Sequence, residues 1–156
     1  MMKRALIAAA LTAFVGTAVA QDCAAPLVIT SEGGTADSVA GDTCAAGNPL
    51  PGMGGTPSPH NDVVYSFVAE GANASIAMGG AATGAVFLLP SPCAVGTDPI
   101  ALGAPGGDMQ VTGLTDGQTY FVVATSDPGT PAATCGAYTL DVTGQLPVEL
   151  QTFSVD

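Results

Sequence analysis

Basic side chains are almost absent from this sequence. Its 156 residues include two, Lys3 and Arg4, against 13 aspartates and glutamates. Proteins contact nucleic-acid phosphates and anionic lipids through lysine and arginine, and nucleotide enzymes use the same side chains in phosphate loops and arginine fingers. The sequence therefore argues against nucleic acid, an anionic membrane surface or a nucleotide as a partner.

Aromatic and imidazole side chains are also scarce. Tryptophan is absent, aromatic residues make up 5% of the chain, and His60 is the sole histidine. Sugar-binding sites usually need flat, exposed aromatic rings, so carbohydrate recognition has no support. A serine hydrolase needs a histidine base, but His60 lies in the segment S-P-H-N-D at residues 58–62, and no G-x-S-x-G motif is present. We predict no enzymatic activity and no catalytic residues, and we expect His60 to cap a strand or to face water.

Residues 1–20 have the pattern of a secretory signal peptide. The two basic residues precede an apolar stretch over residues 5–15, and Ala18-Val19-Ala20 fits a cleavage site. A single membrane span from Leu6 is the alternative, but the stretch is short and no basic stop-transfer flank follows it. Removal of this segment takes away every lysine and arginine. We predict a secreted protein, either extracellular, periplasmic or on the cell surface, of bacterial origin.

Four cysteines follow the leader: Cys23, Cys44, Cys93 and Cys135. An even number of cysteines in an oxidising compartment predicts two disulfides. A zinc site is the alternative, but the chain has no closely spaced C-x-x-C pair and only one histidine. Three connectivities are open. We favour Cys23 with Cys44 and Cys93 with Cys135, because the first two precede the main strands and the last two flank later loops.

The rest of the chain shows strand patterns rather than helical periodicity. The clearest strand covers residues 63–69, where both faces are largely apolar, which predicts a central place in a sheet. Further strands are predicted at residues 74–78, 85–89, 109–114, 119–125 and 137–142. The first two of these are joined by glycine-rich residues and are predicted to pair as consecutive antiparallel strands. In the last, apolar and polar residues alternate, which indicates one buried and one wet face.

Short strands at this spacing predict an all-β fold, an antiparallel two-sheet β-sandwich of the Greek-key or jelly-roll kind. Residues 21–144 are expected to form this one domain. Two loops rich in small residues, 41–61 and 91–107, are long for a compact domain. Such loops are either functional or loose, and disulfides at Cys44 and Cys93 would restrain both.

Three motifs resemble those of bacterial pre-peptidase C-terminal-like domains. Residues 62–67 read D-V-V-Y-S-F, residues 114–123 read L-T-D-G-Q-T-Y-F-V-V, and residues 136–142 read G-A-Y-T-L-D-V. Their order and separations resemble the family over about residues 23–143, although L-x-x-G-x-x-Y also marks the tyrosine corner of other β-sandwiches. The resemblance implies a non-catalytic β-sandwich that usually accompanies a secreted enzyme. Without an attached enzyme, such a module is expected to bind, coat or assemble by itself.

Acidic residues offer two candidate cation sites. Asp98, Asp108, Asp116 and Asp127 lie in turns that contain glycine or proline, and calcium takes such oxygen ligands. No D-x-D-x-D-G loop is present, so Asx turns are the alternative role of these aspartates. His60 and Asp62 would lie on the same side of a strand, but two ligands do not make a metal site. No cofactor is implied, with calcium kept as an alternative.

The tail, residues 145–156, resumes an apolar alternation at Val148, Leu150 and Phe153. It is predicted to be a last strand of the sandwich or a strand donated to a neighbouring copy. We therefore predict a secreted, acidic, disulfide-bonded binding or structural module with an unidentified extracellular ligand or partner protein. The alternatives are a self-assembling surface subunit that uses its C-terminal strand and a calcium-dependent ligand-binding module.

Overall fold

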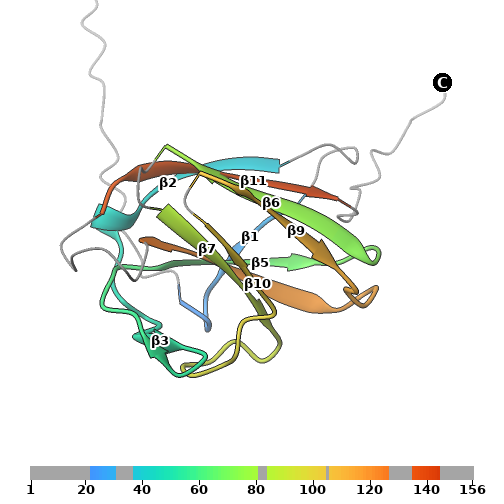
Figure 1. The fold of residues 1–156 in the computed structure, drawn as a ribbon, viewed down its shortest axis with the longest axis horizontal. Helices are drawn as coiled ribbons and strands as arrows, with labels where there is room; N and C mark the ends of the chain where they lie inside the picture. Colours follow the sequence, from blue (N-terminus) through green and yellow to red (C-terminus); the bar gives the residue numbers. More distant parts are fainter. Residues whose placement is uncertain (1–21, 31–36, 81–83, 105, 127–134, 145–156) are drawn as a thin grey trace, which may run out of the picture.

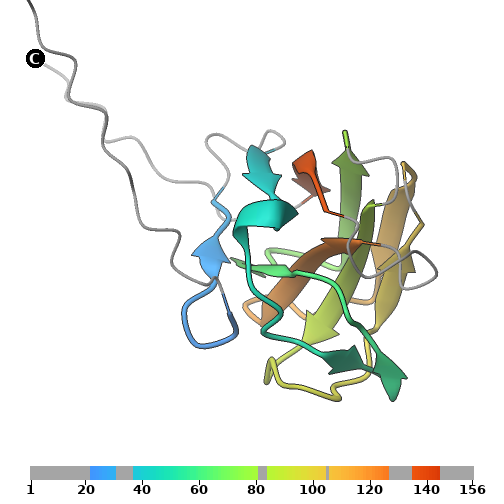
Figure 2. The same ribbon diagram turned by 90° about the vertical axis from the view of Figure 1, so that its left-hand side faces the viewer.

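The computed structural model is a two-layer β-sandwich (Figure 1, Figure 2). It describes residues 22–30, 37–80, 84–104, 106–126 and 135–144, which form strands β1 to β11 and one turn of 3-10 helix, η1 (Thr43–Ala45). The all-β prediction is thus confirmed. No helix within these ranges has the length and apolar character to cross a membrane. The predicted leader (1–20) and tail (145–156) lie outside the described residues, so the division of the chain stays a prediction.

The first layer is a five-stranded sheet in the order β1-β5-β10-β7-β8. In this order its strands are β1 (Leu27–Val28), β5 (Val63–Val68), β10 (Thr119–Ser126), β7 (Gly84–Pro90) and β8 (Ala101–Gly103). Neighbours are antiparallel except β1 and β5, which run parallel. The central strand is β10. The sequence predicts a central place for β5. In the structure β5 lies between β10 and the two-residue edge strand β1, so it is second from the edge.

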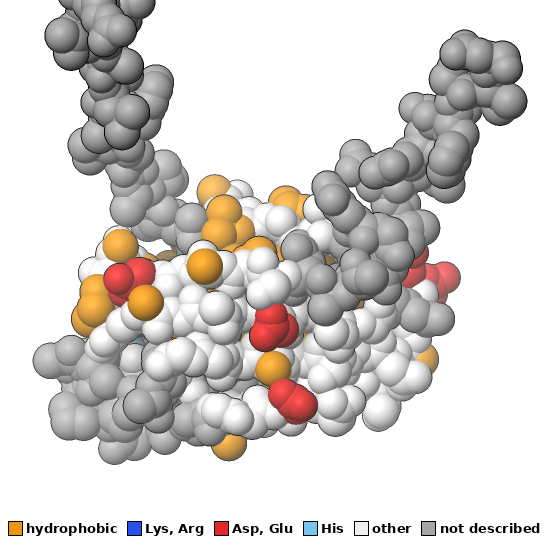
Figure 3. Space-filling model, turned by 90° about the horizontal axis from the view of Figure 1, so that it is seen from above, with side chains coloured by type: hydrophobic (Ala, Val, Ile, Leu, Met, Phe, Trp, Pro, Cys, Tyr) orange, Lys and Arg blue, Asp and Glu red, His pale blue; other side chains and the backbone are white. Residues whose placement is uncertain are grey.

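The second layer is a four-stranded antiparallel sheet. Its strands, in order, are β2 (Asp37–Asp42), β11 (Ala137–Gly144), β6 (Asn73–Gly79) and β9 (Asp108–Thr112). Buried and exposed residues alternate along β9 and β11. The outer face of this sheet carries small and polar residues with a few acidic side chains (Figure 3). The wet face predicted for residues 137–142 is therefore confirmed.

A two-stranded hairpin stands apart from both sheets. It pairs β3 (Gly52–Met53) with β4 (Thr56–Pro57). In Figure 1 it lies beyond the five-stranded sheet, on the side away from the four-stranded one. Sequence patterns do not indicate this hairpin, nor β1, β2 and β8, because these strands are short or rich in glycine and aspartate, which have low strand propensity.

β6 and β7 do not pair with each other, so the predicted pairing of residues 74–78 with 85–89 is wrong. β6 pairs with β9 and β11, whereas β7 pairs with β10 and β8 in the other sheet. Burial explains the separation. β7 is buried along nearly its whole length and suits a sheet covered on both faces, while β6 is buried at alternate residues and suits a sheet with one wet face.

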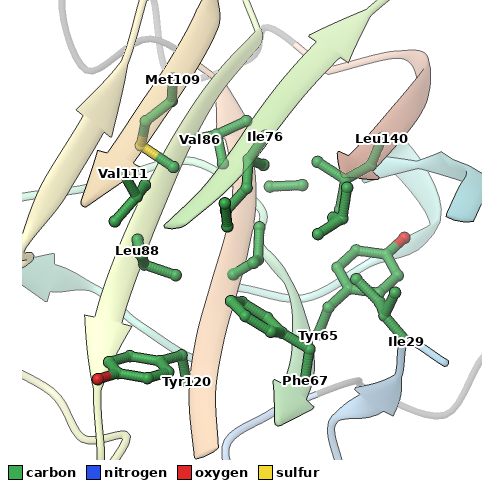
Figure 4. Close-up of a cluster of buried hydrophobic side chains, with 14 of the residues drawn as sticks. Ile29, Tyr65, Phe67, Ile76, Val86, Leu88, Met109, Val111, Tyr120 and Leu140 are labelled. Atoms are coloured by element: carbon green, nitrogen blue, oxygen red, sulfur yellow. The ribbon is translucent and has the colours of Figure 1, made fainter. Parts of the chain in front are cut away.

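The main core lies between the two sheets (Figure 4). Its fully buried side chains include Ile76 and Leu140 from the four-stranded sheet and Leu88 from the five-stranded sheet. The rings of Phe67 and Tyr120 stack with centroids 5.9 Å apart. Dense apolar packing of this kind is the main stabilising term of a two-layer domain.

One polar contact crosses this core. The hydroxyl groups of Tyr65 in β5 and Tyr138 in β11 lie 2.7 Å apart. Gly41 in β2 permits the contact, because a Cβ at that position would collide with the Tyr138 ring. Burial raises the pKa of both phenols, so both stay neutral and the hydroxyl pair persists at all ordinary pH values.

The turn between β9 and β10 is a tyrosine corner. The Tyr120 hydroxyl accepts a hydrogen bond from the Thr115 amide at 2.9 Å. Gly117 has a φ of 75°, a conformation that favours glycine, and Leu114 is buried. The L-x-x-G-x-x-Y motif therefore has a structural role in a turn that joins the two sheets, as in several families of β-sandwich.

Candidate binding surface

The outer face of the five-stranded sheet carries a second apolar cluster. Strand register places Val64, Val123, Phe87 and Leu102 side by side across β5, β10, β7 and β8. The neighbouring row contains Val28, Ser66, Phe121 and Leu89. A sandwich of two layers alone would leave this face in water, yet Val64, Val123 and Leu89 are fully buried.

Residues 47–58, here named the cover segment, bury the centre of this face. Leu50 and Met53 are 1% and 3% exposed and belong to one cluster with Val64, Phe87 and other outer-face residues. Burial of each such side chain contributes roughly 1.5–3 kcal/mol. The cover segment is therefore held by the apolar surface that it hides, and it forms part of the fold rather than a loose loop.

Hydrogen bonds anchor the cover segment at its base. Asp62, directly before β5, donates its amide to the Gly47 carbonyl (2.8 Å) and accepts the Leu50 amide at Oδ2 (3.3 Å). Within the segment, the Asn48 side chain donates to the Ser58 carbonyl (2.9 Å). Asp62 thus connects the start of β5 to the backbone of Leu50, which covers the sheet.

A second set of hydrogen bonds joins the hairpin to the β7–β8 loop. The Gly54 amide donates to the Thr97 carbonyl, and the Gly96 amide donates to the Gly52 carbonyl, each at 3.0 Å. The hairpin and this loop therefore form one continuous surface over the sheet.

Three polar side chains are buried where the cover segment meets β5. Ser58 is 2% exposed, and His60 and Asp62 are 0% exposed. Among the described residues, Ser58 Oγ, both His60 ring nitrogens and Asp62 Oδ1 have no hydrogen-bond partner. Burial raises the pKa of Asp62 to about 6, while hydrogen bonds from Thr125 and Leu50 oppose the rise. The site disfavours the charged carboxylate.

The structure places His60 elsewhere than expected. The ring is fully buried and does not face water, and neither of its nitrogens has a hydrogen-bond partner among the described residues, so it caps no strand there. A buried imidazole is out of reach of a substrate in this conformation. No cluster of three or more histidine, cysteine, aspartate or glutamate side chains suited to a metal occurs in the described part of the chain, so His60 and Asp62 gain no third ligand there.

Three of the four candidate calcium ligands lie in the described part of the chain, in three different segments. Asp98 lies in the β7–β8 loop, Asp108 begins β9, and Asp116 lies in the β9–β10 turn. Asp127 lies outside the described residues. The structure does not gather the three described aspartates into a metal-binding cluster. Calcium binding stays a prediction.

The disulfides join Cys23 to Cys93 and Cys44 to Cys135, so the favoured connectivity is wrong. Cys44 and Cys135 adjoin the ends of the paired strands β2 and β11, and Cys23 and Cys93 lie against the outer-face cluster. Sequence neighbourhood misleads here because strand pairing brings distant cysteines together. Separations of 70 and 91 residues make each bridge worth roughly 4–5 kcal/mol in lost unfolded-state entropy. Two disulfides indicate an oxidising compartment outside the cytoplasm.

The cover segment stops short of the β8 edge and leaves three large apolar side chains exposed. Val95, Ile100 and Leu102 are 61%, 50% and 60% exposed. Leu102 continues the outer-face row that begins at Val64, and Ile100 donates its amide to the Leu88 carbonyl at 2.8 Å just before β8. The outer face is thus buried at its centre and exposed at both edges, at the β8 side and at Val28 of β1, which is 71% exposed.

Two open clefts lie between the cover segment and the β7–β8 loop. One, here named the β8 cleft, measures about 400 Å³ and is lined by Met53, Gly54, Thr56, Phe87, Asp98, Pro99 and Leu102. The other measures about 330 Å³ and is lined by Asp22, Cys23, Ala24, Pro49, Leu50, Ala94 and Val95. Each combines apolar walls with one carboxylate, and this size is within the range of ligand pockets.

Sequence reasoning does not identify this surface. The available signal was the continuous apolar run of residues 85–89, together with the two-sided apolar strand at 63–68. A β-sandwich strand that is apolar on both faces needs a cover on its outer side. What supplies the cover is a loop without apolar periodicity, which no local pattern reveals.

The fold is similar to known structures, but no close sequence relative is found. Aeromonas hydrophila PliG, a periplasmic lysozyme inhibitor of g-type lysozyme, matches with a TM-score of 0.55 and 13% identity, over 76% of this chain and 94% of that one. The pre-peptidase C-terminal domain of collagenase from Bacillus anthracis matches with a TM-score of 0.46 and 18% identity, over the same two shares. No protein-family model and no curated protein sequence matches the chain. The likeness to PliG shows a shared fold, and membership of the pre-peptidase C-terminal-like family stays a prediction.

Proposed function

We propose that this protein is a secreted, non-catalytic module that binds a partner protein through the β8 end of its outer face. The observation that carries the proposal is the exposure of Val95, Ile100 and Leu102 beside a buried apolar cluster. Exposed large apolar side chains at the rims of clefts are typical of protein-binding sites. The burial of His60, the sole histidine, argues against catalysis by an imidazole base.

Site-specific photo-crosslinking in the organism of origin tests this proposal. A photoreactive amino acid replaces Leu102 in the exported protein, and a matched variant carries it at Thr139, which is exposed on the other sheet. We expect an adduct with one identified protein from position 102 and none from position 139. Equal labelling from both positions, or none from position 102, would contradict the proposal.

A g-type lysozyme is the first defined partner to test, because PliG, which shares the fold, is named as its inhibitor. The assay measures lysis of bacterial cell walls by that lysozyme with increasing amounts of the purified protein. Inhibition that Leu102→Ser abolishes would identify the partner. Full lysis at saturating protein would exclude this partner and leave the binding surface to the crosslinking test.

A further inference from the structure

The β8 cleft combines an apolar wall with an unpaired carboxylate. Met53 and Phe87 belong to the buried cluster beneath it, and the exposed Leu102 forms its rim. Gly54, with a φ of 56°, leaves room for the Asp98 carboxylate: a Cβ on this glycine would lie 3.3 Å from Asp98 Oδ1. The carboxylate therefore stands at the cleft wall, next to apolar atoms.

If the predicted leader is removed, no side-chain cation of this chain remains to pair with Asp98. Lysine and arginine do not occur after Arg4, and the sole histidine, His60, is fully buried. The second cleft also contains a carboxylate, Asp22, but its Oδ1 already accepts hydrogen bonds from the Ala24 and Ala25 amides at 2.9 and 3.0 Å. Asp98 is exposed, so its carboxylate can attract a positive charge from a partner, and complementary charges of this kind favour association and specificity.

We infer that the β8 cleft binds a cationic, apolar segment of the partner protein, with an apolar side chain against Met53 and Leu102 and a lysine or arginine facing Asp98. This inference rests on the proposed function and adds the chemistry of the partner. Charge complementarity selects this occupant. A second copy of the chain would bring carboxylates together, and the tail, residues 145–156, contains Glu149 and Asp156 but no base.

A defined peptide serves as the probe. It has seven residues in which lysine alternates with leucine; one control peptide carries glutamate in place of lysine and another carries serine in place of leucine. Titration into the ¹⁵N-labelled protein is followed by NMR. We expect shifts at the amides of residues 53–56 and 95–102, no binding of the glutamate peptide, and much weaker binding of the serine peptide. Binding should also weaken at high salt.

Two pairs of variants locate the contact. Leu102→Ser should weaken peptide binding about tenfold, since it removes buried apolar area. Val68→Ser, at a partly exposed residue of β5, should leave the affinity unchanged. Asp98→Asn should weaken binding several-fold and reduce its salt dependence, whereas Asp116→Asn should change neither. Matching thermal unfolding and intact disulfides verify the fold of each variant.

Several results would overturn the inference. The first is unchanged affinity in both Leu102→Ser and Asp98→Asn, or shifts centred on the four-stranded sheet. The second is sedimentation that shows self-association lost in Leu102→Ser, which would make a second copy the occupant. The third is a change in the NMR shifts of the cleft amides when Phe153→Ser is compared with the parent protein without peptide, which would make the tail the occupant. A crosslinked partner at position 102 that lacks a cationic apolar segment would refute this inference and leave the proposed function intact.

Discussion

The two sheets of this sandwich differ in the burial of their outer faces. Along β9 and β11 of the four-stranded sheet, apolar residues point inward and polar residues point to water. Strands β7 and β10 of the five-stranded sheet are buried on both faces, because the cover segment and the Cys23–Cys93 disulfide lie over the outer one. The cover ends before the edges of the sheet, and exposed apolar residues lie on both sides of it: Val95, Ile100 and Leu102 near β8, and Leu27, Val28 and Val68 on β1 and β5.

The comparison explains why the candidate binding surface lies on one side. The outer face of the four-stranded sheet is complete without a partner, since its small polar side chains are hydrated (Figure 3). The five-stranded sheet needs apolar contact on its outer face, and residues 47–58 supply it only over the centre. Each sheet also has its own disulfide, which makes the two layers separately testable.

The largest expected effect comes from the disulfides. Replacing both cysteines of either pair by serine should lower the free energy of unfolding by roughly 4 kcal/mol, because each bridge closes a long loop. The local effects should differ. Loss of Cys23–Cys93 should speed amide exchange in the cover segment, and loss of Cys44–Cys135 should speed it in β2 and β11. Urea unfolding and hydrogen exchange measure both. The distinction between the layers fails if the cover segment exchanges equally in the two variants.

Apolar truncation should separate the two outer faces. Leu89→Ala removes a fully buried outer-face side chain of β7 and should cost about 2–5 kcal/mol. Thr139→Ala at an exposed outer-face residue of β11 should change stability by less than about 0.5 kcal/mol. Urea denaturation measures the loss of unfolding free energy in each variant. Similar losses would show that the outer face of the five-stranded sheet is not a core.

The pH dependence of stability should report on the base of the cover segment. The pKa of Asp62 is 3.8 before burial and about 6 in the fold, so the folded state binds a proton first as the pH falls. This group therefore contributes stability that is fully present below pH 3.8 and is lost as the pH rises through about 6. Asp62→Asn should remove this loss of stability between pH 3.8 and about pH 6. Urea midpoints at four pH values compare the variant with the parent, and parallel curves would disprove the assignment.

The smallest effect is expected at the uncovered edge. Leu102→Ala should change stability by less than about 0.5–1 kcal/mol, because its side chain is 60% exposed. Phe87 is the neighbour of Leu102 in register on β7 and is 7% exposed. Phe87→Ala should therefore lower the free energy of unfolding by about 3–5 kcal/mol. Thermal unfolding compares the two. A large loss in Leu102→Ala would place this residue in the core and remove it from the candidate binding surface.

The strand predictions from sequence succeeded where the residues themselves carry the pattern. The six predicted strands correspond to β5, β6, β7, β9, β10 and β11 within a residue or two at most of their ends. The alternation in residues 137–142 correctly indicates a wet face. The prediction that β6 and β7 pair fails, because a glycine-rich connection is compatible with a hairpin and with a crossing between sheets alike.

The chain's composition and local periodicity were sufficient for its class: an all-β, strongly acidic domain with apolar strands and an even number of cysteines. Only the tertiary structure decided which cysteines meet, that residues 47–58 form a cover, that His60 is buried, and that the β8 edge stays bare. The physical reason is that strand faces follow from a period of two residues, which is local. Sheet order, disulfide partners and loop placement follow from contacts between residues far apart in the chain, 70 and 91 positions for the disulfides, which no short window of sequence contains.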